Sequence, residues 1–251
     1  MTVAFHDPAR LRQAVDLPAT GFIPVVPGIL RYFVNHMSPN YQSRRARLLR
    51  DVKKSEGKID SLLVSGTANV RYLTGFTGDS SWLFLSAANS VLLSDTRYET
   101  QLADECPGLD IEIRDSGSTI VDTATKIVGK SKAKRLGFEA DHTTVAVLGK
   151  LADRITTATL VATGGLVERL RELKDKWELE QIRAAIEYAQ RGIGVVRSSL
   201  RSAQTETEIR YLLESAMRSF GASGTGFEPI VGVGPTAALP HAHAGDRCVS
   251  E

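Results

Sequence analysis

Short apolar runs alternate with helical patterns from about residue 41 to residue 165 of this chain. Leu62–Val64 and Arg135–Phe138 are too short for buried helices and are typical of buried strands. Ile111-Glu112-Ile113 alternates with a period of two, as a half-buried strand does. Helices that separate such strands cover the faces of a sheet, so the pattern predicts an α/β domain with a mixed sheet.

Turn and capping residues predict where these elements begin and end. The runs Trp82–Leu85 and Val91–Leu93 flank Ala88-Asn89 and predict a β-hairpin. Helices are expected to begin at residues whose side chains accept a hydrogen bond from a first-turn N–H group. The expected caps are Thr96 with Glu99 as a capping box, Ser118, and Thr143 or Thr144.

The basic run from Arg44 to Lys54 is interleaved with apolar residues. Leu48, Leu49 and Val52 recur among its arginines and lysines. This spacing predicts an amphipathic helix whose basic side chains lie on the solvated face.

Two longer helices are expected in the next part of the chain. The apolar stripe of the first has helical spacing and comprises Ile182, Ile186, Ala189, Ile193, Val196 and Leu200. Thr205 to Glu208 forms a capping box for the second, whose apolar residues run from Ile209 to Phe220. Gly221 is placed to end that helix. A strand is expected after it, around Ile230.

Two histidines follow the expected strand. Phe227–Gly234 leads through a Gly/Pro loop to His241 and His243. A rigid element that feeds such a loop is a usual way to present a catalytic side chain. In an extended segment, residues two apart face the same way, so both rings can reach one ligand.

Other interpretations of these histidines and of nearby motifs stay open. The pair is also consistent with exposed loop histidines. A zinc-type His-x-His site needs further ligands, and Asp246 and Glu251 lie on a short tail that holds geometry poorly. Gly192-x-Gly194 lies inside a helical stripe and is not a dinucleotide motif, and Gly232-x-Gly234 lacks the Lys-Ser/Thr of a phosphate loop.

Composition argues against several classes of protein. With 42% hydrophobic and 24% charged residues the chain has the balance of an ordinary globular protein. Its net charge of +2 is too small to predict nucleic acid or a membrane as a partner. Cys106 and Cys248 predict neither a disulfide framework nor a thiolate zinc site. Met1–Gln13 has no signal-peptide core and no run is long enough to span a membrane, so a cytoplasmic location is expected.

Four segments resemble, in order and spacing, the creatinase/aminopeptidase P/prolidase family of metallopeptidases. Asn69–Gly78 and Ser94–Tyr98 are similar to its non-catalytic N-terminal domain. Arg171–Arg183 resembles the linker and the first catalytic-domain helix. Gly226–Arg247 resembles the opening of the catalytic domain, where an Ile-Val pair and a Gly-containing turn precede a Pro-His step. The resemblance covers roughly residues 44 to 247.

The resemblance implies a three-part organisation. Residues 1–40 hold five prolines without periodicity and are expected to be an irregular extension outside the resemblance. A creatinase-type α/β domain is expected over 41–165, and over 166–251 the first part of an α+β pita-bread metallopeptidase domain. Gly78-Asp79-Ser80, which otherwise suggests a serine nucleophile, is then structural. Asp95 and Arg97 are expected to stabilise a strand-to-helix turn for the same reason.

The resemblance also implies a chemistry. Complete members cleave Xaa-Pro bonds in peptides with proline at the second position, using two divalent ions, Mn²⁺ or alternatively Co²⁺ or Zn²⁺. His241 matches a family histidine that contacts the substrate and can donate a proton to the scissile carbonyl or the tetrahedral intermediate. His243 has no clear counterpart and is a secondary candidate. A homo-oligomer without nucleic-acid or membrane partners is expected.

The family's metal ligands are two Asp, one His and two Glu, and the resemblance places them after the Pro-His segment. Gly245–Val249 does not match the first of them. The chain is therefore expected to be truncated in its catalytic domain, to bind no family metal, and to be inactive by itself. The alternative is a non-catalytic protein-interaction module derived from the same family.

Overall fold

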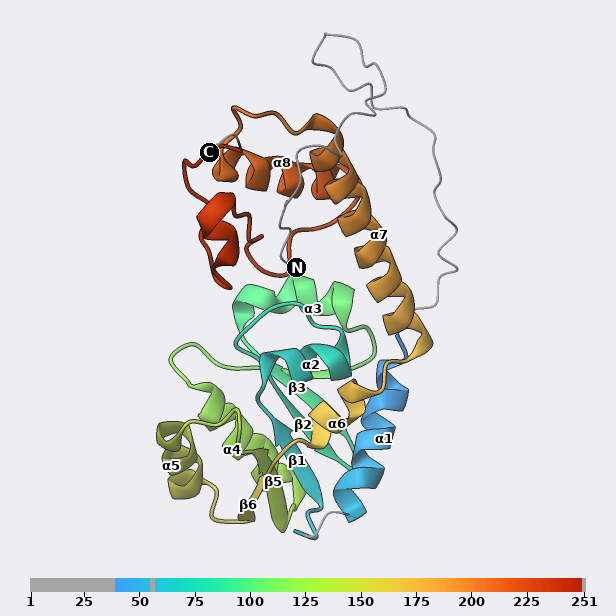
Figure 1. Cartoon of the computed structure of the whole chain (residues 1–251). Coiled ribbons are helices and arrows are strands. Elements are labelled where there is room, and N and C mark those ends of the chain that lie inside the picture. Colours follow the sequence, from blue (N-terminus) through green and yellow to red (C-terminus); the bar gives the residue numbers. More distant parts are fainter. Residues whose placement is uncertain (1–38, 55–56, 250–251) are drawn as a thin grey trace. The chain divides into compact units, whose positions relative to one another are not determined.

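The computed structural model describes residues 39–54 and 57–249, which belong to two compact units (Figure 1). The N-terminal unit is Met37–Asp175, and the C-terminal unit contains Lys176–Glu251. The expected irregular extension lies almost entirely outside the described residues, as does Glu251. No helix in the described ranges is long and apolar enough to cross a membrane.

A six-stranded mixed sheet forms the centre of the N-terminal unit. Its strand order is β4-β3-β2-β1-β5-β6. β2 is antiparallel to both of its neighbours, and the other neighbouring strands are parallel. The predicted mixed α/β sheet and the hairpin formed by β2 and β3 are confirmed. The strands are β1 (Ser61–Val64), β2 (Trp82–Ser86), β3 (Ser90–Ser94), β4 (Asp110–Ile113), β5 (Arg135–Glu139) and β6 (Thr159–Thr163).

Helices cover both faces of this sheet (Figure 1). One core contains residues of α1 (Tyr41–Lys54), α2 (Thr67–Thr74), α3 (Glu99–Glu105) and α6 (Leu166–Glu172). The other contains residues of α4 (Ile120–Ser131) and α5 (Val145–Arg154). Successive strand residues point to opposite faces, so Leu62 and Val64 join the first core while Leu63 joins the second. This is why β1 is apolar at consecutive positions.

The observed helix starts agree in part with those predicted from the sequence. Thr144 caps α5 by accepting a hydrogen bond from the Val147 N–H, as predicted. The prediction of Ser118 as a cap is wrong, because Thr119 caps α4 in a capping box with Asp122. The prediction of a capping box formed by Thr96 and Glu99 is also wrong. Asp95 precedes them, and its carboxylate accepts the Arg97 N–H and caps the short 3₁₀ helix Thr96–Tyr98.

Arg44 is an exception to the predicted solvated face of α1. Arg47, Arg50, Lys53 and Lys54 are exposed, as expected. Arg44 is buried, lies over the Tyr72 ring at 4.1 Å, and donates a hydrogen bond to Asp175 Oδ2 at 2.5 Å. A guanidinium can be buried where a carboxylate and an aromatic face replace its hydration.

Two helices dominate the C-terminal unit. α7 (Lys176–Ser199) and α8 (Glu206–Ser219) pack together around Val196, Ile209 and Val231. A Cβ on Gly192 would lie 2.6 Å from Met217 Cγ, so this glycine allows the close approach of the two helices. The capping box of Thr205 and Glu208 and the left-handed Gly221 (φ +113°) are confirmed.

The prediction of a strand around Ile230 is wrong. Among the described residues from 221 to 249 no strand is present, and only isolated bridge residues occur. The Val233 N–H donates to the side chains of Glu206 and Thr236 instead of to a neighbouring strand. The 3₁₀ helix η3 (Gly234–Ala238) follows directly.

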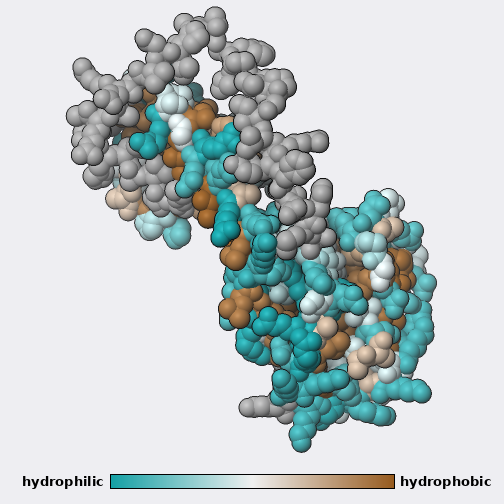
Figure 2. Space-filling view, turned by 90° about the vertical axis from the view of Figure 1, so that its right-hand side faces the viewer, coloured by the Kyte–Doolittle hydropathy of each residue, from teal (hydrophilic) through white to brown (hydrophobic). Residues whose placement is uncertain are grey.

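The apolar stripe of α7 is only partly covered within its own unit. Val196 is buried at 5% exposure, whereas Ile182 and Ile186 are 43% and 51% exposed. Figure 2 shows hydrophobic residues at the surface along α7. The helical period was predicted correctly, but this end of the stripe is exposed.

Candidate functional site

A buried carboxylate at the start of α8 holds the loop that carries His241 and His243. Glu206 is 1% exposed. Its Oε1 accepts hydrogen bonds from the Val233 N–H at 2.8 Å and from the Thr236 hydroxyl. Its Oε2 accepts from the Gly245 N–H at 2.9 Å. One side chain therefore holds both ends of the histidine loop.

Burial and hydrogen bonding act in opposite directions on Glu206. Burial raises the pKa of this carboxyl group, but hydrogen bonds from Thr236, Gly245 and Val233 outweigh that effect, and the pKa lies below its ordinary value. The group is thus an anion at neutral pH. An anion is also favoured here because the first turn of a helix carries a partial positive charge.

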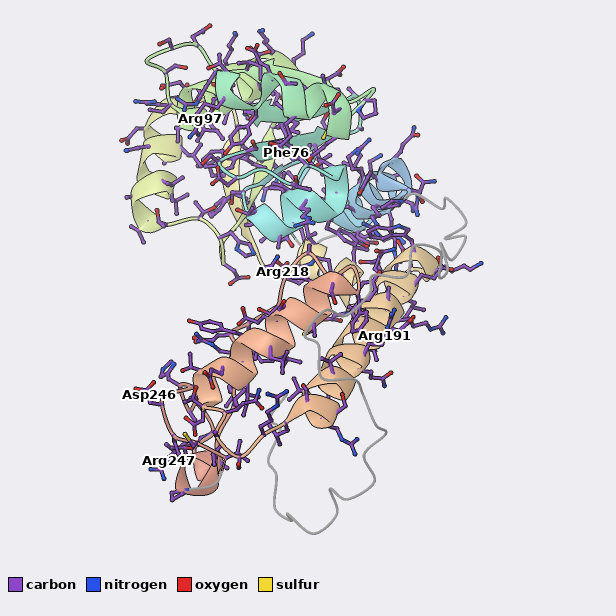
Figure 3. All side chains as sticks on the ribbon, turned by 90° about the horizontal axis from the view of Figure 1, so that it is seen from above. Phe76, Arg97, Arg191, Arg218, Asp246 and Arg247 are labelled. Atoms are coloured by element: carbon purple, nitrogen blue, oxygen red, sulfur yellow. The ribbon has the colours of Figure 1, made fainter. Side chains whose placement is uncertain are left out.

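The segment after the histidines runs beside the beginning of α8. The Thr207 N–H donates to the Gly245 carbonyl at 3.1 Å, and the Glu206 N–H donates to the Arg247 carbonyl at 3.0 Å. These N–H groups lie in the first helical turn, where no partner exists within the helix. Figure 3 shows Asp246 and Arg247 at the end of α8 opposite to Arg218. The segment therefore satisfies the start of the helix and is itself fixed.

A close backbone contact shapes the beginning of the loop. A Cβ on Gly232 would lie 2.8 Å from Ala237 Cα and 2.9 Å from Ala237 N. Only glycine permits this approach without a shift of the backbone. The turn into η3 therefore depends on the absence of a side chain at position 232.

Both candidate histidines reach solvent. His241 and His243 are exposed, while Ala242 between them is buried at 8% exposure. His243 Nδ1 lies 3.9 Å from Glu228 Oε2, and Glu228 also pairs with Arg210 of α8. His243 thus borders an ion-pair cluster, whereas His241 stands at the turn that Ala242 N makes with the Leu239 carbonyl.

Metal-binding groups do not gather around these histidines. Within residues 39–54 and 57–249, one group of three candidate ligands has its donor atoms within 4.8 Å of one another, and it lies in the N-terminal unit. His241, His243 and Asp246 form no such group. The described part of the C-terminal unit therefore does not fit a two-metal centre, nor does it fit the zinc-type His-x-His alternative.

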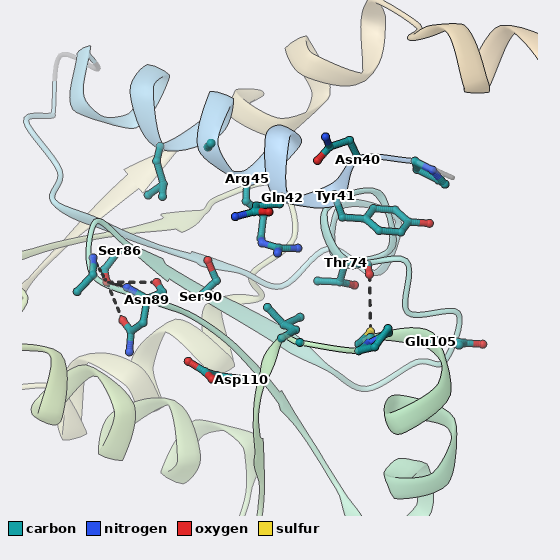
Figure 4. Close-up of a pocket in the computed structure, with 18 of the residues that line it drawn as sticks. Asn40, Tyr41, Gln42, Arg45, Thr74, Ser86, Asn89, Ser90, Glu105 and Asp110 are labelled. Carbon is teal, nitrogen blue, oxygen red and sulfur yellow. Dashed lines mark hydrogen bonds between the residues drawn. The ribbon is translucent and has the colours of Figure 1, made fainter. Parts of the chain in front are cut away.

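A hollow of about 860 Å³ lies in the N-terminal unit beside α1 and the loop after α3 (Figure 4). Tyr41, Arg45, Thr74 and Cys106 contribute to its lining. Burial raises the pKa of the Cys106 thiol, and its Sγ lies 3.7 Å from the Thr74 carbonyl oxygen. The thiol is therefore protonated at neutral pH, so Cys106 is not an activated nucleophile.

Sequence reasoning found the histidines but missed the residue that fixes their loop. In the sequence, Glu206 is recognisable only as part of the Thr205–Glu208 capping box. A buried role for a glutamate in a first helical turn carries no short-range signal, because its partners lie 27 to 39 positions away.

Comparison with known proteins identifies the family. Residues 44–173 match the model of the creatinase/prolidase N-terminal domain, and residues 180–251 match that of metallopeptidase family M24. The chain belongs to the creatinase/aminopeptidase P/prolidase family of metallopeptidases. The expected family is therefore confirmed.

Sequence and structural relatives are consistent with this assignment. An uncharacterized peptidase of Bacillus subtilis, YqhT, is 31% identical over 191 residues, which are 76% of this chain and 54% of that protein. The Xaa-Pro dipeptidase from Bacillus anthracis matches with a TM-score of 0.73 and 27% identity, over 84% of this chain and 58% of that one. The X-Pro aminopeptidase from Thermotoga maritima matches with a TM-score of 0.72 and 30% identity, over 82% of this chain and 57% of that one. This chain spans about half the length of these relatives.

Proposed function

We propose that this chain acts in Xaa-Pro peptide hydrolysis and supplies a histidine that contacts the substrate. The carrying observation is the structural match to an Xaa-Pro dipeptidase and an X-Pro aminopeptidase over more than four fifths of the chain. The M24 match over residues 180–251 includes the loop of His241. We assign the substrate contact to His241 and keep His243 as a secondary candidate.

The chemistry of the bond explains why a histidine is useful at this position. The nitrogen of an Xaa-Pro bond carries no hydrogen and cannot donate to the enzyme, so the bond offers only its carbonyl oxygen as an acceptor and the ring must be recognised by shape. A neutral imidazole can donate one N–H to the carbonyl oxygen and stabilise the charge that develops there. The hydrogen bonds of Glu206 would reduce the movement of the loop during this contact.

The metal requirement follows from the family and not from the described residues. Two divalent ions, Mn²⁺ or alternatively Co²⁺ or Zn²⁺, would activate water and polarise the carbonyl in complete members. The described C-terminal unit has no group of three candidate ligands, so we derive no step through these ions. We propose that the described residues contribute the contact with an Xaa-Pro peptide and not the metal ligands. A cytoplasmic location and the domain limits 1–40, 41–165 and 166–251 remain predictions.

Calorimetric titration with a peptide that has proline at its second position tests this function. Wild type, His241→Ala and His243→Ala are compared, with an alanine-for-proline peptide as control, and release of the N-terminal residue is followed with added Mn²⁺. Loss of one hydrogen bond costs about 1 kcal/mol, so His241→Ala should weaken binding several-fold. His243→Ala should have a smaller effect. Equal binding of both peptides would contradict the proposal, and absence of any peptide binding would favour the non-catalytic interaction module.

A further inference from the structure

Three potential metal ligands meet in the N-terminal unit, away from the histidine loop in sequence. Glu139 ends β5, His142 follows in the next turn, and Glu168 lies in the first turn of α6. Each offers one donor atom, and these atoms lie within 4.8 Å of one another. His142 Nε2 lies 3.0 Å from Glu168 Oε1. Neither the proposed function nor the family resemblance assigns a role to this triad.

The buried member of the triad is held rigidly. Glu139 is 6% exposed, and its Oε2 accepts the backbone N–H groups of Ser65 and Gly66 at 2.7 Å each. These N–H groups lie at the start of α2, which follows β1. The two hydrogen bonds fix the position of the carboxylate. A carboxylate oxygen that can bind a cation is therefore held in position by the protein alone.

A buried amide brings the two carboxylates together. Asn69 is fully buried, and its Nδ2 donates to Glu139 Oε1 at 2.7 Å and to Glu168 Oε1 at 2.5 Å. Arg171 donates to Asn69 Oδ1 at 2.9 Å and so fixes the orientation of the amide. Two negative charges thus face the same small region, where a neutral amide is the group between them. A divalent cation there would neutralise both charges.

A glycine makes room for the imidazole. A Cβ on Gly66 would lie 2.7 Å from His142 Cδ2 and 2.8 Å from Cγ, so the ring occupies the space that a side chain would fill. The ring therefore lies against the start of α2, with Nε2 directed to Glu168. This arrangement is a second feature, independent of the carboxylates, that places the nitrogen in the cluster.

The position in the sheet is one where ligands commonly bind. β1 and β5 are parallel neighbours, and the triad lies at their carboxyl ends. From β1 the chain continues to β2 on one side, and from β5 it continues to β6 on the other side. In α/β sheets a crevice forms where neighbouring strands lead in opposite directions.

We propose that Glu139, His142 and Glu168 bind one divalent transition-metal ion. One imidazole nitrogen and two carboxylate oxygens form a three-ligand set that suits Zn²⁺, with water completing the coordination. Bonds of ~2.0–2.2 Å would bring tetrahedral ligand atoms to about 3.4 Å from one another. The side chains of His142 and Glu168 are 37% and 36% exposed, so they have room for this small movement. Binding would exchange the hydrogen bond between them for two metal bonds.

Equilibrium dialysis of the chelator-treated full chain against micromolar Zn²⁺, followed by elemental analysis, tests the site. Wild type should retain one Zn²⁺ per chain. His142→Ala and Glu168→Gln should each weaken binding at least about tenfold. The matched control His241→Ala/His243→Ala removes the other two histidines in the described part of the chain and should bind like wild type. Glu139 is left intact because its hydrogen bonds hold the start of α2.

Thermal unfolding gives a second measurement on the same proteins. Zn²⁺ should raise the Tm of wild type and of the double-histidine control but not of His142→Ala. Absence of Zn²⁺ from wild type, retention by His142→Ala, or loss from the control would each overturn the proposal. Because the measurement is metal binding and not peptide binding or hydrolysis, its failure leaves the proposed function intact.

Discussion

The carboxylate of Glu206 accepts the backbone N–H of Gly245 at 2.9 Å across 39 positions of the chain. The same side chain accepts the Val233 N–H from the other end of the loop that carries His241. The first turn of α8 is thus the fixed point of the candidate site. The conformation of the loop therefore depends on a residue that lies outside the loop itself.

Replacement of Glu206 should loosen this loop. Glu206→Ala leaves the N–H groups of Val233 and Gly245 without their acceptor, and we expect a loss on the order of 2 kcal/mol in the free energy of unfolding. Hydrogen exchange at residues 231–249 should accelerate. Glu214→Ala on the same helix is the control and should leave exchange unchanged. Equal exchange in Glu206→Ala and wild type would refute the anchoring role.

Asp95 should make the N-terminal unit sensitive to acid. Hydrogen bonds from Arg97, opposed by burial and supported by Arg114, hold the pKa of Asp95 well below its usual range. Its stabilising contribution is therefore fully present above the ordinary value of about 3.9 and is lost as the pH falls toward the folded-state pKa. Asp95→Asn should be less stable than wild type at pH 7, and the difference should shrink below about pH 4.

Urea unfolding at neutral and acidic pH in a Trp177→Phe background, followed by the fluorescence of Trp82 in the N-terminal unit, measures this difference. The exposed Asp153→Asn is the control and should match wild type at neutral pH. A stability difference for Asp95→Asn that is the same at both pH values would show that the ion pairs are not its source.

Gly232→Ala should destabilise the C-terminal unit. The added Cβ would meet the Ala237 backbone at 2.8 Å, and backbone cannot move aside as a flexible side chain does. We expect a cost of ~1–3 kcal/mol. Gly194→Ala in α7 is the matched control, because nothing lies within 4 Å of its Cβ position. That change should stabilise the unit by ~0.5–1 kcal/mol. Equal Tm values for the two variants would contradict the contact.

The exposed end of the α7 stripe should drive self-association. Ile182 and Ile186 are 43% and 51% exposed, and such a stripe favours burial against another chain. The double variant Ile182→Ser/Ile186→Ser should lower the self-association constant measured by sedimentation velocity, with a stability change within about 0.5 kcal/mol per residue. Arg183→Ser, on the same helix, is the control. Wild type that stays monomeric at every concentration would sink this prediction.

Features that depend on neighbouring residues were predictable from the sequence. Leu62, Leu63 and Val64 identified a strand buried on both faces, because consecutive side chains of a strand face opposite cores. Thr205 identified the start of α8, and the pair Thr143 or Thr144 identified that of α5, because a cap acts across three positions. The strand near Ile230 was predicted from the same kind of local signal and is absent, because Glu206 takes the hydrogen bond of Val233.

Within the candidate site, the sequence predicted only those residues whose type by itself suggests a chemical role. His241 and His243 were found because histidines after a Gly/Pro loop are conspicuous. The sequence by itself thus determined the family, the mixed sheet with its β2–β3 hairpin, the two long helices α7 and α8, and the position of the two histidines along the chain. Tertiary structure alone decided that Glu206 anchors their loop and that Glu139, His142 and Glu168 meet. Except for Glu139 and His142, which are neighbours in sequence, these residues lie 26 to 39 positions apart, and local chain preferences carry no information about which distant partners meet.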